Sequence, residues 1–173
     1  MEIFIPDVYK KSIYDIDYES LKKSGIKCII FDLDNTIAPI NVPVPDSEIK
    51  DLISDLILLG FKVILMSNSN KTRVEPFKEK LNIDSCCNSM KPMKNKYKKI
   101  LNIYGFKDNE IACVGDQLLT DILGANRMGF LSILVNPISN VDYFGTKINR
   151  IFERKIFEIL EKRGLLKVGE YYE

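Results

Sequence analysis

Four aspartates are the first candidates for chemistry, because each lies at or just beyond the end of an apolar run. Asp32 and Asp34 are two residues apart in FDLDNTI, and Asp116 and Asp121 are five apart in VGDQLLTD. Like charges this close repel each other and are costly to desolvate, so a cation must offset them. Oxygen ligands without nitrogen or sulfur donors favour Mg²⁺. The aspartates therefore predict a magnesium site.

A second set of residues is suited to binding an anion. Ser67 ends the apolar run KVILMS and is followed by Asn68 in SNSN, near the start of an expected helix, where backbone N–H groups favour anions. Lys91, in MKPMK, can supply a point charge to a phosphoryl oxygen. An anionic carboxylate can approach an anionic phosphate only if cations screen it. We therefore expect Ser67, Asn68 and Lys91 to bind phosphate.

The chain that must position these residues alternates short apolar runs with helical patterns. The runs predict strands at 27–32, 62–67, 86–88, 111–116 and 131–135, and the patterns predict helices at 47–60, 71–81, 95–105, 118–129 and 146–163. This order is typical of an α/β fold, a three-layer Rossmann-like parallel sheet with helices on both faces. Ligands of such sheets bind at the carboxyl ends of the strands, so Asp32, Ser67 and Asp116 should meet in one crevice.

Composition narrows the class of protein further. The 173 residues suit a single domain, with a core at about 26–135, and the net charge of +1 gives no bulk attraction to nucleic acid. Histidine is absent, which excludes imidazole catalysis and histidine metal ligands. The four cysteines form no C-x-x-C pair, so we expect reduced thiols. No apolar segment reaches the ~20 residues of a membrane span, and the first residues resemble neither a signal peptide nor an anchor, so we expect a cytoplasmic protein.

The motifs DLDNT, SNS, KP and GDQLLTD, in this order, resemble the four motifs of the haloacid dehalogenase (HAD) superfamily of phosphohydrolases over residues 26–135. The resemblance implies that Asp32 is a nucleophile that forms an aspartyl-phosphate. It also implies that Asp34 protonates the leaving group and then activates water. The second aspartate of DLD favours phosphoryl transfer over dehalogenation, since the dehalogenases of this superfamily lack it.

The same resemblance implies the ligands of the cofactor, Mg²⁺. The metal would bind Asp32, the backbone carbonyl of Asp34, and Asp116, with Asp121 supporting the site. Ser67 and Lys91 would hold the phosphoryl group.

Longer segments, SIYDIDYESLKKSGIKCIIFDLDNTI, VGDQLLTDILGANRMG and DYFGTKINRIFER, resemble the YqeG family of subclass III A. That subclass has no large cap domain, and only about 30 residues separate Thr36 from Ser67. The family is similar to mitochondrial phosphatidylglycerophosphate phosphatases, which remove the terminal phosphate from a phospholipid headgroup. The resemblance thus implies a phosphorylated small molecule or a phospholipid headgroup as the substrate.

Two other functions stay open at this point. The first is a phosphatase of soluble sugar or nucleotide phosphates with the same mechanism. The second is a non-catalytic phospho-aspartate receiver or interaction module, although a receiver needs no general acid at the position of Asp34. Taken singly, Asp34 could equally be a turn residue, while Ser67 is more often a loop start and Lys91 more often a solvated lysine. It is their joint order along the chain that favours an active site.

Two basic stretches of the sequence could bind an anionic membrane surface. The lysines at 91, 94, 96, 98 and 99, and the net positive segment 142–167, could attract an anionic surface at the inner face of a membrane. We slightly favour a solvated helix face for the lysines. The helix at 146–163 carries an apolar stripe, which we expect to pack on the domain rather than lie on lipid. That stripe consists of Ile148, Ile151, Phe152, Ile156, Ile159 and Leu160.

Overall fold

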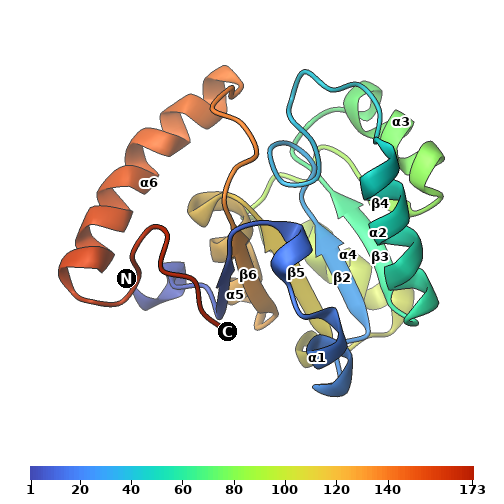
Figure 1. Cartoon of the computed structure of the whole chain (residues 1–173), viewed down its shortest axis with the longest axis horizontal. Coiled ribbons are helices and arrows are strands. Elements are labelled where there is room, and N and C mark those ends of the chain that lie inside the picture. The colour runs from blue at the N-terminus through green and yellow to red at the C-terminus, as the bar shows by residue number, and fades with distance from the viewer.

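The computed structural model describes residues 1–173 and is built on a six-stranded sheet (Figure 1). Its strands are β1 (Val8–Lys10), β2 (Cys28–Phe31), β3 (Lys62–Met66), β4 (Asp84–Cys86), β5 (Ile111–Gly115) and β6 (Leu131–Val135). The order across the sheet is β1-β6-β5-β2-β3-β4, and every neighbouring pair is parallel. The parallel sheet predicted from the alternating pattern is confirmed.

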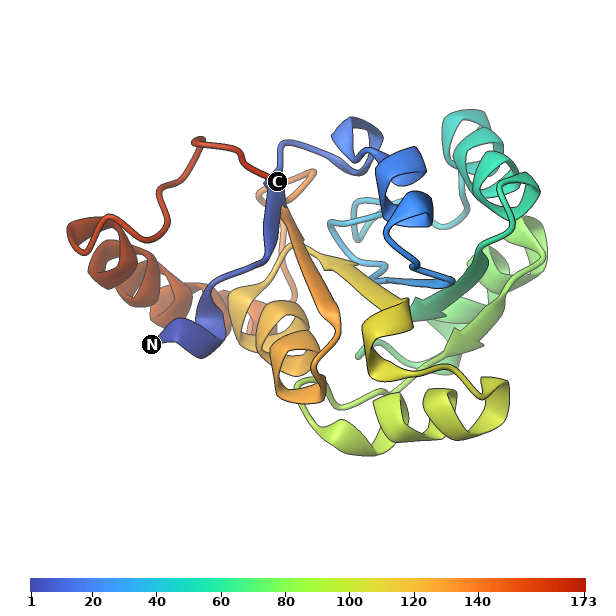
Figure 2. The same cartoon turned by 90° about the horizontal axis from the view of Figure 1, so that it is seen from below.

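Helices cover both faces of this sheet (Figure 2). On β2, Ile29 and Phe31 pack with α1 (Tyr18–Lys23), α2 (Ser47–Leu58) and α3 (Lys71–Leu81). The alternate residues Cys28 and Ile30 pack on the other face with α4 (Lys94–Tyr104) and α5 (Leu123–Met128). Because successive side chains of a strand point to opposite faces, an uninterrupted apolar strand needs this double cover. The three-layer Rossmann-like architecture is therefore confirmed.

Local signals fix where the helices begin and end. The side chain of Asp46 accepts a hydrogen bond from the N–H of Ile49 at 2.9 Å and caps α2. Asn70 caps α3 in the same way through the N–H of Arg73, at 3.1 Å. Gly105 ends α4 with a φ of +69°, a left-handed conformation that glycine adopts without a Cβ penalty.

Three elements differ from the sequence-based expectation. Strand β1 has no predicted counterpart, because only three residues form it and charged residues flank it on both sides. The strand expected at 86–88 lies at Asp84–Cys86. The helix expected at 118–129 begins as a π-helical turn, Leu118–Ile122, before it continues as α5.

The C-terminal helix α6 (Phe144–Lys162) lies beyond the β1 edge of the sheet, at the left of Figure 1. The expectation that its apolar stripe packs on the domain is wrong for most of the stripe. Leu160 is buried, and it packs with Tyr9 and Leu118, with Ile156 half-buried beside it. The other four members of the stripe are exposed: Ile148, Ile151, Phe152 and Ile159.

Most of the apolar stripe of α6 is exposed because polar side chains occupy the inward face of this helix. Arg150 and Glu153 point to the carboxyl ends of the strands and bond there. None of the helices is both long enough and apolar enough to cross a lipid bilayer.

Candidate active site

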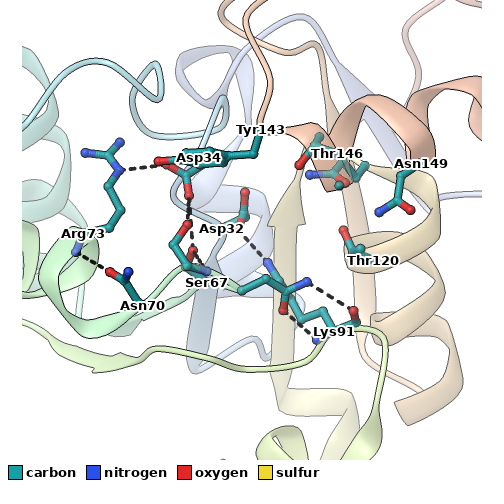
Figure 3. A pocket seen from close by; sticks show the side chains of 14 residues that line it. Asp32, Asp34, Ser67, Asn70, Arg73, Lys91, Thr120, Tyr143, Thr146 and Asn149 are labelled. Carbon is teal, nitrogen blue, oxygen red and sulfur yellow. Dashed lines mark hydrogen bonds and ion pairs between the residues drawn. The ribbon is translucent and has the colours of Figure 1, made fainter.

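Lys91 is the central side chain of the candidate site, and it is buried (Figure 3). Its ammonium donates to Asp32 Oδ1 and to Asp121 Oδ1, both at 2.6 Å, and to the carbonyl oxygen of Met66 at 2.9 Å. These partners come from the ends of β2 and β3 and from the π-helical turn after β5. A single cation thus joins three segments that are far apart in the sequence.

Asn68 holds the loop that carries Lys91. Its side-chain oxygen accepts from the backbone N–H of Lys91 at 2.7 Å and from Ser89 Oγ at 2.9 Å. Its amide nitrogen donates to the carbonyl oxygen of Lys91 at 3.2 Å. Both the oxygen and the nitrogen of the Asn68 side chain already have protein partners. We therefore expect any contact of Asn68 with phosphate to come from its backbone N–H. Its phosphate-binding role stays a prediction.

Asp34 has a different set of polar partners from Asp32. Its Oδ1 accepts from Arg73 Nε at 2.9 Å, and its Oδ2 accepts from Ser69 Oγ at 2.6 Å and Ser67 Oγ at 3.4 Å. The Arg73 guanidinium also donates to the carbonyl oxygens of Val42 and Pro39. Arg73 therefore clamps the Asp34 side chain to the loop that follows it.

The carboxylates of Asp32, Asp116 and Asp121 converge, with one oxygen of each within 4.8 Å of the others. All three are buried. Thr36 Oγ1 donates to Asp116 Oδ1 at 3.2 Å, and the N–H of Gln117 donates to Asp121 Oδ2 at 3.1 Å. The sequence-based expectation grouped these aspartates with the backbone carbonyl of Asp34, and the Asp34 carboxylate indeed lies outside the cluster.

Gly115 explains how Asp121 can reach the cluster. A Cβ at position 115 would lie 2.2 Å from Asp121 Cγ, far inside van der Waals contact. Only glycine leaves room for that carboxylate against the end of β5. The glycine of GDQLLTD is therefore required by the packing of the second aspartate of the same motif.

Arg150 of α6 contacts the aspartate cluster at Asp116, whereas Lys91 contacts it at Asp32 and Asp121. Its guanidinium forms an ion pair with Asp116 Oδ2 and donates to the Asp116 carbonyl oxygen at 2.9 Å. It also pairs with Glu153 Oε2 at 3.0 Å and with Asp142 Oδ2 at 3.4 Å. Glu153 Oε1 in turn accepts from the N–H of Leu119 at 2.9 Å. These bonds attach α6 directly to the ends of the strands.

Burial dominates the electrostatics of the cluster. It raises the pKa of Asp32 well above its usual range, with the neighbouring Asp121 and Asp116 adding to the rise and Lys91 opposing it. Burial likewise raises the pKa of Asp116 to about 6, although Arg150 acts in the opposite direction. Burial acts to lower the pKa of the Lys91 ammonium, but Asp121 and Asp32 outweigh it and raise that pKa. The carboxylates outnumber the cations that face them.

This donor set fits a magnesium ion. Three buried carboxylates with oxygens within 4.8 Å, and no nitrogen or sulfur donor among them, form the all-oxygen surroundings that a hard divalent cation prefers. The added positive charge would favour the ionised form of Asp32, against the burial and the neighbouring carboxylates that raise its pKa. Asp32 and Asp116, with Asp121 behind them, are the residues that would hold it.

Beside the cluster is an open cavity of about 530 Å³ (Figure 3). Asp32, Asp34, Ser67, Asn68 and Lys91 all line it, as the sequence predicts. Asp116 does not line this cavity, and it lines a neighbouring cavity beside α6 instead. Of the three residues expected in one crevice, Asp32 and Ser67 line this cavity. Asp116 contacts the cavity only indirectly, because its carboxylate lies in the cluster with that of Asp32.

Several residues of the cavity wall have no role that the sequence assigns. Tyr143, Thr146 and Asn149 come from the start of α6 and face Lys91 and Asp32 across the cavity. Tyr143 is the sole aliphatic or aromatic side chain in the lining, so the cavity suits a polar group. Arg73 and Ser69 line the side of Asp34. Ser69 lies in SNSN, and Thr146 and Asn149 lie in DYFGTKINRIFER, but neither segment indicates what these residues do.

The fold and the site define a class of protein. The structure aligns with that of a Legionella pneumophila protein assigned to subfamily III A of the HAD superfamily hydrolases, with a TM-score of 0.50 and 21% identity, over 70% of this chain and 72% of that one. The parallel sheet thus has the fold of the HAD hydrolases.

Residues 1–139 match the family model described as mitochondrial PGP phosphatase, and the chain belongs to that family of phosphatases. It is 37% identical over 169 residues to "Probable phosphatase YqeG" of Bacillus subtilis (strain 168), which covers 98% of both chains. It is 26% identical over 150 residues to phosphatidylglycerophosphate phosphatase 1, chloroplastic/mitochondrial, of Arabidopsis thaliana. That match covers 82% of this chain but 43% of the plant protein. The protein is accordingly a phosphoric monoester hydrolase.

Proposed function

We propose that this phosphatase hydrolyses the terminal phosphate of phosphatidylglycerophosphate through an aspartyl-phosphate on Asp32. The observation that carries the reaction is the position of Asp32. Lys91 donates a hydrogen bond to Asp32 Oδ1, and Asp32 lines a cavity whose wall is polar except for Tyr143. The substrate is supported by the family to which the chain belongs and by the name of its plant relative.

In the first step, a carboxylate oxygen of Asp32 forms a bond to phosphorus while the bond from phosphorus to the substrate alcohol oxygen breaks. Asp34, protonated at this stage, donates its proton to that leaving oxygen. Ser67 and Lys91, with backbone N–H groups after β3, hold the phosphoryl oxygens at the cavity floor. Covalent catalysis of this kind divides one difficult transfer into two easier ones.

In the second step, Asp34 accepts a proton from water, and the water oxygen bonds to phosphorus as the Asp32–phosphorus bond breaks. Inorganic phosphate leaves, Asp32 is regenerated, and Asp34 is again protonated. Arg73 and Ser69 both donate to the Asp34 carboxylate. Asp34 must therefore give up the ion pair with Arg73 when it carries the proton of the first step. Magnesium held by Asp32 and Asp116 would supply positive charge that screens the carboxylate from the phosphate.

The test compares substrates and metal. Phosphatidylglycerophosphate in mixed micelles is assayed against a panel of soluble sugar and nucleotide phosphates, with Mg²⁺ and with a chelator. We expect release of phosphate from the lipid to be fastest, and to stop on chelation. A clear preference for a soluble ester would replace the lipid substrate with the soluble alternative.

The Asp32→Asn variant is the control for the site. It should lose turnover on every ester while its circular dichroism spectrum stays that of the wild type. Activity close to the wild-type level would remove Asp32 as the nucleophile. The two outcomes are independent, because the first concerns the leaving alcohol and the second the attacking atom.

A further inference from the structure

Helix α6 has two faces with different tasks. Its inner face carries Thr146 and Asn149 on the cavity wall, the bonded pair Arg150 and Glu153, and the buried Leu160. Its outer face carries an exposed apolar row, which we call the outer stripe. The stripe consists of Phe144, which is 80% exposed, with Ile148, Ile151, Phe152 and Ile159.

The outer stripe lies along one side of the helix. Its members follow Phe144 at intervals of four, seven, eight and fifteen residues, and at 3.6 residues per turn these positions lie on one side of the helix. Between them, Lys155 and Lys162 fall on the same side and are exposed. No other element covers this side of α6, which lies at the outer edge of the molecule (Figure 1).

Charge distinguishes between the partners that an apolar stripe could have. The exposed charged residues of α6 are four basic and two acidic, and its C-cap adds the exposed Arg163. The basic residues are Lys147, Arg154, Lys155 and Lys162, and the acidic residues are Glu158 and Glu161. A helix with apolar residues on one side and an excess of lysine and arginine around them is typical of helices that lie in an anionic membrane surface. A second copy of the chain would bring these basic residues against one another.

We propose that the outer stripe of α6 binds the surface of an anionic lipid membrane and thereby presents the cavity to the lipid headgroups. This inference rests on the proposed function, because a phosphorylated phospholipid stays in its membrane and the enzyme must come to it. Tyr143 lines the cavity, and the next residue, Phe144, begins the stripe. With a helix diameter of about 10–12 Å, the cavity on the inner face would lie within about one helix width of the headgroup layer.

The absence of tryptophan from the chain gives a clean reporter of docking. A Phe152→Trp variant is mixed with vesicles of phosphatidylcholine, alone or in equal parts with phosphatidylglycerol, whose acyl chains are brominated. We expect bromine to quench its fluorescence with the anionic vesicles, and less so at high salt. The matched control is Leu58→Trp, at a site 84% exposed at the end of α2, which should not be quenched. Equal quenching of the two variants, or none, overturns the proposal.

A second pair of variants connects docking with catalysis. Ile151→Ser combined with Phe152→Ser should lower partitioning onto anionic vesicles by at least about tenfold. It should reduce hydrolysis of phosphatidylglycerophosphate in those vesicles in parallel, but leave hydrolysis of a soluble aryl phosphate unchanged. The control, Leu58→Ser with Ile103→Ser, removes two exposed apolar side chains from α2 and α4 and should change neither. Equal loss in both double variants overturns the proposal.

These outcomes separate docking from the proposed substrate. If the wild type binds anionic vesicles but hydrolyses only soluble esters, docking stands and the lipid substrate fails. If it hydrolyses the lipid in micelles but binds no vesicle, docking fails and the substrate stands. Sedimentation velocity tests whether a second copy of the chain covers the outer stripe. The proposal is overturned if the wild type is a dimer that binds no vesicles and the double serine variant is a monomer.

Discussion

Asp32 and Asp34 are two residues apart, yet they lie in different surroundings. Asp32 is buried against Lys91 and two other aspartates, where its pKa is raised. Asp34 is held by one guanidinium and two serine hydroxyls at the edge of the cavity. Buried Leu33 lies between them, in the core, as strand alternation predicts. A cation bound at the cluster would favour the ionised form of Asp32 that a nucleophile requires, whereas Asp34 lies outside the cluster.

The Asp34→Asn variant should separate the two proposed steps. Loss of a general acid–base typically reduces the rate by ~10²–10⁴-fold. With p-nitrophenyl phosphate, whose alcohol leaves without protonation, the first step should survive and the second should not. A rapid burst of one nitrophenolate per enzyme, followed by slow turnover, is the expected time course. A uniform decline without a burst would mean that Asp34 does not serve the hydrolysis of the phosphoenzyme.

Gly115→Ala tests whether the packing of Asp121 matters to the metal. The added methyl would lie 2.2 Å from Asp121 Cγ, so the carboxylate must move away from Lys91. We expect a higher Mg²⁺ concentration for half-maximal activity, and a loss of stability of about 1–3 kcal/mol from overpacking. Gly145→Ala is the control for stability, because a Cβ there meets nothing within 4 Å. An unchanged magnesium requirement would separate Asp121 from the metal.

At the scale of elements, the start of α3 connects a helix cap to the site. Asn70 caps the helix through the N–H of Arg73, and the Arg73 side chain holds Asp34. Asp46 caps α2 in the same manner, but it has no such connection to the cavity. We therefore expect the two caps to stabilise their helices to a similar degree. Only the cap of α3 also positions a residue that holds Asp34.

This difference gives a matched pair of variants. Asn70→Ala and Asp46→Ala should each lower the free energy of unfolding by about 0.5–2 kcal/mol, as lost caps do. Asn70→Ala alone should also reduce kcat, since the backbone that carries Arg73 loosens. Urea unfolding and steady-state kinetics of both variants measure the two effects. Equal kcat values in the two variants would show that Arg73 does not depend on the cap.

At the scale of the whole molecule, Arg150 connects α6 to the strand ends. It pairs with Asp116, Asp142 and Glu153, and its side chain is 21% exposed. The loop before α6 is tied to the DLDNT loop as well, because Asn35 Nδ2 donates to the carbonyl oxygen of Val141 and to Asp142 Oδ1, both at 2.9 Å. The cavity wall formed by α6 thus depends on contacts with the same aspartate that would hold the metal.

Arg150→Met should weaken this attachment. Removing one partner of a buried ion pair typically costs ~3–5 kcal/mol, and partial exposure lowers the expected cost here to about 2 kcal/mol. Amide hydrogen exchange across 144–162 should become faster than in the wild type. The exposed Arg154, one residue after Glu153, provides the control substitution Arg154→Met, which should leave exchange unchanged. Unaltered protection in Arg150→Met would mean that Leu160 and its apolar neighbours hold α6 alone.

The sequence by itself determined five of the six strands, the double cover of the sheet, and the aspartates, serine and lysine that follow its strands. These follow from local periodicity and from the rule that parallel strands end at one edge. Only the tertiary structure decided which side of α6 faces inward. The helix carries an apolar stripe and a polar face, and periodicity alone favours burying the stripe. Arg150 and Glu153 instead turn inward, because Asp116 and the N–H of Leu119 offer them partners that lie 34 residues away in the chain. Pairing at that distance leaves no periodic trace in the sequence, so the exposed stripe could be found only in the folded molecule.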